Sequence, residues 1–229
     1  MTDIRTETVP LVDGSALRLT VAEPVSSVRG GIVVLHEARG VTDAVRGLAS
    51  GLAADGWLVV APHLYHRDGA DELDGDDGEV QTHVNRLDGE QITADTDTAF
   101  GWLADHGIGA DRMGIIGFDL GGSVALLIAA RRTLGAAVTV AGNKLNSVPA
   151  GLFDRLVDSI DGLTCPWLGI FGELPDGGND PQIDRLRAAA ASSDVATDVV
   201  VYRSHRFDDD PAAADAWQRT LNWFDSHLR

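Results

Sequence analysis

Short apolar runs alternate along this chain with segments in which apolar residues recur at helical spacing. Gly31–Leu35 and Trp57–Ala61 are apolar almost throughout and rich in β-branched residues, which is typical of strands buried on both faces. Between them, residues 42–55 place apolar side chains three or four positions apart and are followed by Gly56. This pattern predicts an amphipathic helix that stops at the glycine.

The alternation continues to the end of the chain and predicts a mostly parallel sheet with helices on both faces. Val9–Val21, with Asp13-Gly14 at its centre, predicts an antiparallel hairpin before it. No repeat or linker divides the sequence, so we expect one domain, residues 1–229, without a large cap domain. Further strands are predicted at 113–116, 136–140, 167–171 and 198–202, and further helices at about 91–106, 123–130, 151–160, 181–191 and 212–227.

Residues 62–89 form the one irregular stretch and are too many for a simple connector. We interpret them as a lid over the site or as a mobile surface loop. The acidic centre, residues 68–79, does not have the carboxylate spacing of an EF-hand calcium loop. A solvated acidic loop is therefore the favoured interpretation of that centre.

The composition limits the partners that the chain can have. Its 229 residues include 35 acidic and 18 basic ones, for a formal net charge of −17. A field of this sign repels nucleic acid and anionic membranes, so neither is expected as a partner. The N-terminal residues show no apolar signal segment and the longest apolar run, Val124–Ala130, is too short to cross a bilayer, which predicts a cytoplasmic protein. The lone Cys165 indicates a packed core thiol rather than a disulfide or a zinc cluster.

A sharp strand-to-helix turn is predicted at Gly117-Phe118-Asp119-Leu120-Gly121. An apolar strand precedes it and a helix-like run follows, which is the context of a nucleophile elbow. Glycines two positions before and after the centre let the backbone turn tightly, because a Cβ there would clash. The central side chain of such an elbow stands above the carboxyl ends of the strands, and here it is aspartate instead of serine or cysteine.

Three more chemically active residues follow strands at the edge where doubly wound sheets bind ligands: Glu37, Asp176 and His205. The order Asp119, Asp176, His205 is the order of nucleophile, acid and histidine in α/β-hydrolase triads. Imidazole can relay a proton near neutral pH, and a neighbouring acid fixes its tautomer and stabilises the imidazolium. We therefore predict that Asp119 is a nucleophile or a water-orienting carboxylate, His205 the base and Asp176 its acid.

Glu37 and two backbone amides complete the predicted site. We expect the fold to bring Glu37 near Asp119, so that one of the two carboxyl groups has a raised pKa. Capping of the following helix is the alternative role for Glu37. A cation held between the two carboxylates, with His205 as a third ligand, is a further one, but no ligand spacing supports it, so no metal is expected. The N–H groups of Ala38 and Leu120 are predicted to form an oxyanion hole.

Arg39 and Arg206 are the predicted substrate-binding residues, because guanidinium binds a carboxylate through two hydrogen bonds. Pairing with the many aspartates of the chain is the equally weighted alternative. His63 and His66 are interpreted as packing and hydrogen-bonding residues, and His36 as a residue that satisfies buried backbone.

Five segments resemble the dienelactone hydrolase family. They run from the N-terminal third of the chain to its last helix and stand in the family's order. The resemblance implies an α/β-hydrolase that acts on small ester or lactone carbonyls without a cofactor. It also implies that Glu37 pairs with the resting nucleophile. The segments are Val34-Leu35-His36-Glu37-Ala38-Arg39-Gly40-Val41, Val60-Ala61-Pro62-His63-Leu64-Tyr65-His66-Arg67, Ile116-Gly117-Phe118-Asp119-Leu120-Gly121-Gly122, Ser204-His205-Arg206-Phe207 and Ala216-Trp217-Gln218-Arg219-Thr220-Leu221.

The chain departs from the family pattern at the nucleophile and at the acid. The family has cysteine or serine where Asp119 stands, and Asp176 comes one position late, so Glu173 and Asp180 remain alternatives. Haloalkane dehalogenases and epoxide hydrolases are similar at the elbow aspartate, which displaces at an sp³ carbon. Two further hypotheses therefore stand beside lactone or ester hydrolysis: displacement of that kind, and a non-catalytic binding protein that kept the fold.

Overall fold

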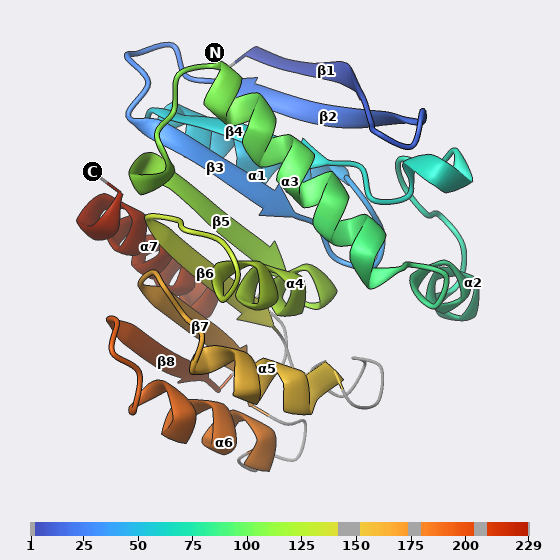
Figure 1. The fold of residues 1–229 in the computed structure, drawn as a ribbon. Helices are drawn as coiled ribbons and strands as arrows, with labels where there is room; N and C mark the ends of the chain where they lie inside the picture. The colour runs from blue at the N-terminus through green and yellow to red at the C-terminus, as the bar shows by residue number, and fades with distance from the viewer. Residues whose placement is uncertain (1–2, 142–151, 174–179, 204–209, 229) are drawn as a thin grey trace. The chain divides into compact units, whose positions relative to one another are not determined.

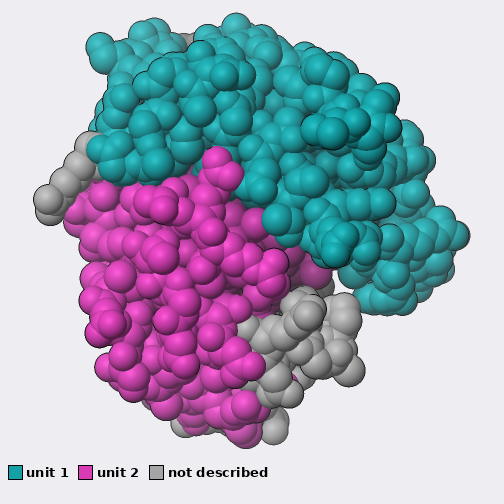
Figure 2. All heavy atoms as spheres, viewed as in Figure 1, with its two compact units in different colours: residues 1–113 teal, residues 114–229 magenta. Residues whose placement is uncertain are grey.

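The computed structural model describes residues 3–141, 152–173, 180–203 and 210–228. The chain forms two compact units, residues 1–113 and residues 114–229, which Figure 2 shows in separate colours. That the chain is a single domain stays a prediction.

Unit 1 contains four strands in the order β1-β2-β4-β3. β1 and β2 form the predicted antiparallel hairpin, in which Pro10 lies opposite Ala16. β2 is also antiparallel to β4, whereas β3 and β4 are parallel. Every residue of β3 and β4 is buried, which explains why both are continuous apolar runs. The bounds are β1 (Asp3–Pro10), β2 (Ala16–Glu23), β3 (Gly30–Leu35) and β4 (Trp57–Pro62).

Two helices, α1 (Asp43–Ala54) and α3 (Gly89–Asp105), pack against β4, and Figure 1 shows them on opposite faces of the strands. α1 begins where the sequence predicts, because the Thr42 side chain accepts the Val45 N–H. It ends at Ala54, just before Gly56, whose φ of 97° is favourable for glycine alone. The two helices thus cover both faces of β4, and α3 also contacts β3.

Residues 62–89 contain a helix that the hydrophobic pattern of the sequence does not predict. α2 (Asp77–Val84) follows the short 3₁₀ turn η1 (His66–Asp68), so the stretch is neither wholly irregular nor only a loop. The hydrophobic pattern misses α2 because Val80 and Val84 are its only buried residues. The sequence does contain a capping box that indicates this helix. The Asp76 side chain accepts N–H groups of the first turn, and the Glu79 carboxylate accepts the Asp76 N–H.

Unit 2 contains four parallel strands in the order β5-β6-β7-β8. Helices α4 and α7 pack against β6, and Figure 1 shows them on opposite faces of it. Both predicted features, parallel strands and helices on both faces, are therefore confirmed here. The bounds are β5 (Met113–Phe118), α4 (Leu120–Ala129), β6 (Ala136–Ala141), α5 (Leu152–Ile160), β7 (Trp167–Gly172), α6 (Pro181–Ala190), β8 (Thr197–Tyr202) and α7 (Asp210–His227), with the 3₁₀ turn η2 (Ala110–Arg112) before β5.

The described residues thus contain eight strands of a mostly parallel mixed sheet with helices, which confirms the predicted α/β fold class. Cys165 is fully buried, as predicted, and burial raises the pKa of its thiol to about 12. Among the described residues, no helix has both the length and the apolar composition needed to cross a membrane.

Candidate active site

The predicted elbow is present in unit 2, between β5 and α4. Asp119 has φ 48° and ψ −108°, and it is the one residue other than glycine with positive φ in the described part of the chain. Its backbone is fixed on both sides, since the Asp119 N–H donates to Val140 at 2.8 Å and its carbonyl accepts the Ser123 N–H at 3.2 Å. Residues in such conformations are strained and collect at functional sites.

Asp119 occupies the position before α4 without capping it. Its side chain accepts no hydrogen bond from the first turn of that helix, although the turn is fully described. Asp76, Asp88 and Asp180 do accept such bonds at the starts of α2, α3 and α6, each with its backbone in the extended region. Asp119 therefore has neither the extended conformation nor the side-chain hydrogen bond of a capping aspartate, although capping is the commonplace reason for an aspartate at this position.

In unit 1, the loop after β3 holds Glu37, Ala38 and Arg39, all half-buried. The Glu37 carbonyl accepts the Gly40 N–H at 3.2 Å, which closes a tight turn. A bound carboxylate or oxyanion could be held here by backbone amides, because among the described residues none accepts the Ala38 N–H. Burial raises the pKa of the Tyr65 phenol, and the charges of Asp68 and Glu37 raise it further.

Arg39 joins this loop to the segment before α2. Its terminal nitrogens donate to the carbonyls of Leu73 at 3.2 Å and Gly75 at 3.1 Å, and to the carboxylate of Asp77 at 2.9 Å. The backbone adds to the connection, because Leu73 donates to the Arg39 carbonyl at 3.0 Å. Arg39 thus shows the aspartate pairing that the sequence left open, and its role in substrate binding stays a prediction.

Two buried side chains hold the carbonyls of this loop. His36 is 2% exposed and its Nδ1 lies 2.6 Å from the Glu37 carbonyl oxygen, while its Nε2 accepts the Leu64 N–H at 3.2 Å. Tyr65 is 1% exposed and donates its hydroxyl to the Ala38 carbonyl at 2.7 Å. The interpretation of His36 as a residue that satisfies buried backbone is confirmed. The sequence does not predict the hydrogen bond from Tyr65 to the Ala38 carbonyl. The only indication of a role for Tyr65 is its position between His63 and His66.

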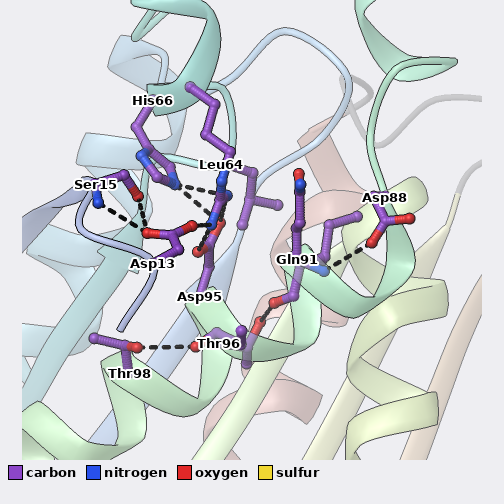
Figure 3. Close-up of polar contacts among 12 residues, drawn as sticks. Asp13, Ser15, Leu64, His66, Asp88, Gln91, Asp95, Thr96 and Thr98 are labelled. Carbon is purple, nitrogen blue, oxygen red and sulfur yellow. Dashed lines mark hydrogen bonds and ion pairs between the residues drawn. The ribbon is translucent and has the colours of Figure 1, made fainter. Parts of the chain in front are cut away.

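A second polar cluster is centred on Asp95 of α3. Asp95 is 1% exposed and is bound by Arg67 through two hydrogen bonds, of 2.7 and 3.0 Å. His66 lies 3.1 Å from the same carboxylate (Figure 3). Asp13 lies 3.4 Å from Arg67. Asp95 was not predicted, although it stands among the apolar positions of a helix, where a charge needs a partner.

His63 takes part in a separate buried network. Its Nε2 contacts the Thr20 hydroxyl at 2.8 Å and its Nδ1 contacts the Asp71 carboxylate, which also pairs with Arg18 at 2.7 Å. The Asp71 carbonyl accepts the Val41 N–H at 3.0 Å. These bonds confirm the interpretation of His63 and His66 as packing and hydrogen-bonding residues, and they tie the loop after β4 to the loop after β3.

The comparisons with known proteins place the chain in a family. The family model described as the dienelactone hydrolase family matches residues 17–228. This chain belongs to that family. It is accordingly a hydrolase of the dienelactone hydrolase type, as the resemblance of its motifs implies.

Relatives of the dienelactone hydrolase family match most of this chain. A carboxymethylenebutenolidase of Rhodococcus opacus is 30% identical over 213 residues, which are 86% of this chain and 81% of that protein. A provisionally named carboxymethylenebutenolidase of Yersinia pestis is 30% identical over 86% of this chain and 78% of its own length. A provisionally named 2-oxo-3-(5-oxofuran-2-ylidene)propanoate lactonase of Bradyrhizobium is 27% identical over 86% and 84%.

Solved structures confirm the fold. The crystal structure of a provisionally assigned dienelactone hydrolase from Klebsiella pneumoniae has a TM-score of 0.85 and 28% identity, with 99% of this chain and all of that chain covered. The dienelactone hydrolase of Anabaena variabilis has a TM-score of 0.73 at 20% identity, covers 100% and 99% of the two chains, and supports the fold alone.

Several predicted site residues of this family member lie outside the described residues: His205, Asp176 and Arg206. Their roles stay predictions. Of the two alternatives for the acid, Asp180 is 8% exposed and caps α6. Its carboxylate accepts the Gln182 N–H at 2.8 Å, so one of its hydrogen bonds is already used by the helix. Glu173 follows β7 and donates its backbone N–H to Tyr202 at 2.9 Å. Among the described site residues, Asp119 and Leu120 are neighbours in sequence in unit 2. Glu37 and Ala38 are neighbours in sequence in unit 1.

Proposed function

We propose that this chain opens a small lactone ring by adding water to its ester carbonyl at the Asp119 elbow. The observation that carries the proposal is that Asp119 keeps a strained elbow conformation while its side chain does not cap the helix that follows. Strain of this kind persists where the surrounding structure holds it for a function. The family membership supports carbonyl hydrolysis as that function.

The names of the relatives indicate the chemical class of the lactone. A carboxymethylenebutenolide and a (5-oxofuran-2-ylidene)propanoate are both five-membered lactones whose side chain ends in a carboxylate. We propose a substrate of this class for the present chain. With a net charge of −17, the protein repels such an anion at long range, so a local cation has to bind it. Arg206 is the better candidate, because Arg39 already donates through both terminal nitrogens.

In this proposal Asp119 orients water and does not attack the carbonyl itself. Attack by a carboxylate would give a tetrahedral intermediate with two leaving groups. A carboxylate leaves far more readily than the ring oxygen, because it is the weaker base, so the intermediate returns to substrate. Water attack avoids this reversal, because the neutral nucleophile loses its proton to a base as the bond forms.

The other predicted residues take the remaining roles. His205 accepts the proton of the attacking water and returns one to the ring oxygen as the C–O bond breaks, and Asp176 keeps its imidazole in the required tautomer. The N–H groups of Ala38 and Leu120 stabilise the oxyanion, with Leu120 at the positive end of α4. Glu37 tunes the charge of Asp119. The product is one ring-opened molecule that carries a new carboxylic acid and an alcohol or enol, so the reaction is hydrolysis without a redox step or a cofactor.

A substrate panel tests the proposed function. The panel contains a carboxymethylenebutenolide, the same lactone without its carboxylate, a simple aryl ester, a haloacid and an epoxide. Asp119→Ala and His205→Ala are assayed beside the wild type, with Asp111→Ala as the matched control because Asp111 is an exposed aspartate in η2. We expect lactone turnover that both site variants lose and the control keeps, with KM lower for the carboxylate-bearing lactone.

Other outcomes of the panel remove the proposal. Turnover of the haloacid or epoxide alone assigns displacement at an sp³ carbon to Asp119. No turnover of any compound, with all four proteins folded, leaves the non-catalytic binding protein as the account of the chain.

A further inference from the structure

The peptide group between Glu37 and Ala38 is held from its carbonyl side. Its oxygen accepts two hydrogen bonds, from His36 Nδ1 at 2.6 Å and from the Gly40 N–H at 3.2 Å. The next carbonyl, of Ala38, accepts the Tyr65 hydroxyl at 2.7 Å. Both peptide planes that flank the Ala38 α-carbon are therefore fixed by buried side chains.

The tautomer of His36 follows from its two partners. The Leu64 N–H donates to Nε2 at 3.2 Å, so Nε2 carries no proton. The proton of the neutral ring is then on Nδ1, where it is donated to the Glu37 carbonyl. His36 is 2% exposed, and burial lowers its pKa to about 4, so the ring stays neutral and keeps this arrangement at neutral pH.

Fixing the Glu37 carbonyl also fixes the Ala38 N–H. The two belong to one planar trans peptide group, in which C=O and N–H point in opposite directions. Hydrogen bonds to the oxygen also polarise the group and strengthen the N–H as a donor. Among the described residues no acceptor takes this N–H, so its donor capacity is left for a bound group.

We propose that His36 is a positioning residue for the oxyanion hole. Its Nδ1–H aims and polarises the Ala38 N–H through the Glu37 carbonyl, and Tyr65 fixes the following peptide plane. The inference rests on the proposed function, in which the Ala38 N–H stabilises the oxyanion of the opening lactone. His36 does not touch the substrate, so its effect is on kcat more than on KM.

A purely structural role for His36 makes a different prediction. The ring also satisfies the buried Leu64 N–H, and loss of that bond lowers stability without any effect on the Ala38 amide. The two functions of the ring sit on different nitrogens. They can therefore be removed one at a time.

Two conservative variants separate the functions. His36→Asn places an amide nitrogen at the distance of Nδ1 from the backbone, so it keeps a donor for the Glu37 carbonyl and gives up the acceptor for Leu64. His36→Gln places an amide oxygen at the distance of Nε2, so it keeps the acceptor and gives up the donor. In lactone hydrolysis we expect His36→Gln to lose about tenfold in kcat, less than the roughly 10²–10³ that deleting an oxyanion donor costs. We expect His36→Asn to keep kcat within about threefold and to unfold at lower urea concentration.

Nitrogen NMR of the folded protein gives a readout that does not need turnover. In the wild type we expect a protonated Nδ1 and an unprotonated Nε2 at pH 7. The Ala38 amide signal should shift in His36→Gln and stay near its wild-type position in His36→Asn. A spectrum with the proton on Nε2 overturns the inference whatever the kinetics show.

The kinetics also decide whether His36 positions the Ala38 amide or is only structural. Equal kcat in both variants, or a kcat that follows the urea midpoint in both, makes His36 structural and overturns the inference. If the wild type turns over no lactone while Nδ1 carries the proton, the proposed function has failed and the catalytic part of the inference fails with it. The spectrum and the assay thus distinguish the two failures.

Discussion

Gly117 and Gly121 approach so closely at the elbow that a Cβ atom on Gly117 would lie 2.0 Å from the Gly121 carbonyl oxygen. The neighbouring atom is backbone at the start of α4, so it cannot move aside as a side chain would. Only glycine at 117 allows the chain to reverse from β5 into α4. The conformation of Asp119 between these two glycines depends on that reversal.

Gly117→Ala is expected to unfold the elbow. The clash should cost at least about 3 kcal/mol in the free energy of unfolding. Gly101→Ala is the matched control, because Gly101 lies inside α3 with nothing within 4 Å of an added Cβ. That variant should gain up to about 1 kcal/mol from helix propensity. Urea unfolding of both variants measures the difference, and equal stability would show that the close approach is absent.

Asp119 should store measurable strain. Asp119→Gly and Asp119→Ala both lack the carboxylate, but only glycine adopts φ 48° without cost. We expect the glycine variant to be more stable than the alanine variant by about 1 kcal/mol, with lactone hydrolysis lost in both. Thermal and urea unfolding check the order. An alanine variant as stable as the glycine variant would mean that the turn relaxes.

The Arg67–Asp95 pair should be worth far more than an exposed pair. Asp95→Ala leaves the Arg67 guanidinium without its main partner next to a 1% exposed position, and we expect a loss of about 3 kcal/mol. Asp184→Ala breaks the exposed pair with Arg187 on α6 and should cost less than about 1 kcal/mol. The comparison is made from urea midpoints at pH 7. A loss at Asp95 no larger than that at Asp184 would contradict the burial of the pair.

His36 should make the protein less stable in acid. Its pKa is about 4 in the fold against 6.5 ordinarily, because burial disfavours the charged ring. Between these pH values the unfolded chain binds a proton that the folded chain does not, so stability falls as pH falls from 6.5 to 4. The difference amounts to about 3 kcal/mol over this interval. His36→Gln lacks the contribution, so its free energy of unfolding should fall less between pH 7.5 and pH 4. A fall equal to that of the wild type would mean that His36 protonates normally.

The sequence predicts the regular elements well because burial on both faces leaves an unambiguous trace. β3, β4, β6 and β7 are buried at every residue, and each reads as a short apolar run. The elbow is equally readable, since its glycines are required by backbone contact. α2 is not readable in this way, because a helix with two buried valines has almost no apolar face.

Contacts between residues distant in the chain are harder to predict. The sequence places Arg39 next to Glu37, but nothing local shows that its guanidinium reaches Leu73, Gly75 and Asp77. The bond from Tyr65 to the Ala38 carbonyl likewise depends on how two loops meet. A catalytic role can be assigned from a motif, whereas the residues that hold the motif in place become visible only in three dimensions.

The final position of the water oxygen distinguishes attack by water from attack by the Asp119 carboxylate. The protein, in excess over a carboxymethylenebutenolide, turns over once in water enriched in oxygen-18 and is then digested with trypsin in ordinary water. The tryptic peptide 113–131 contains Asp119 as its only side-chain carboxyl group. We predict one oxygen-18 atom in the ring-opened acid and none in this peptide, because water attacks the lactone carbonyl. Label in Asp119 would show that its carboxylate forms a covalent intermediate, and would contradict the water-orienting role.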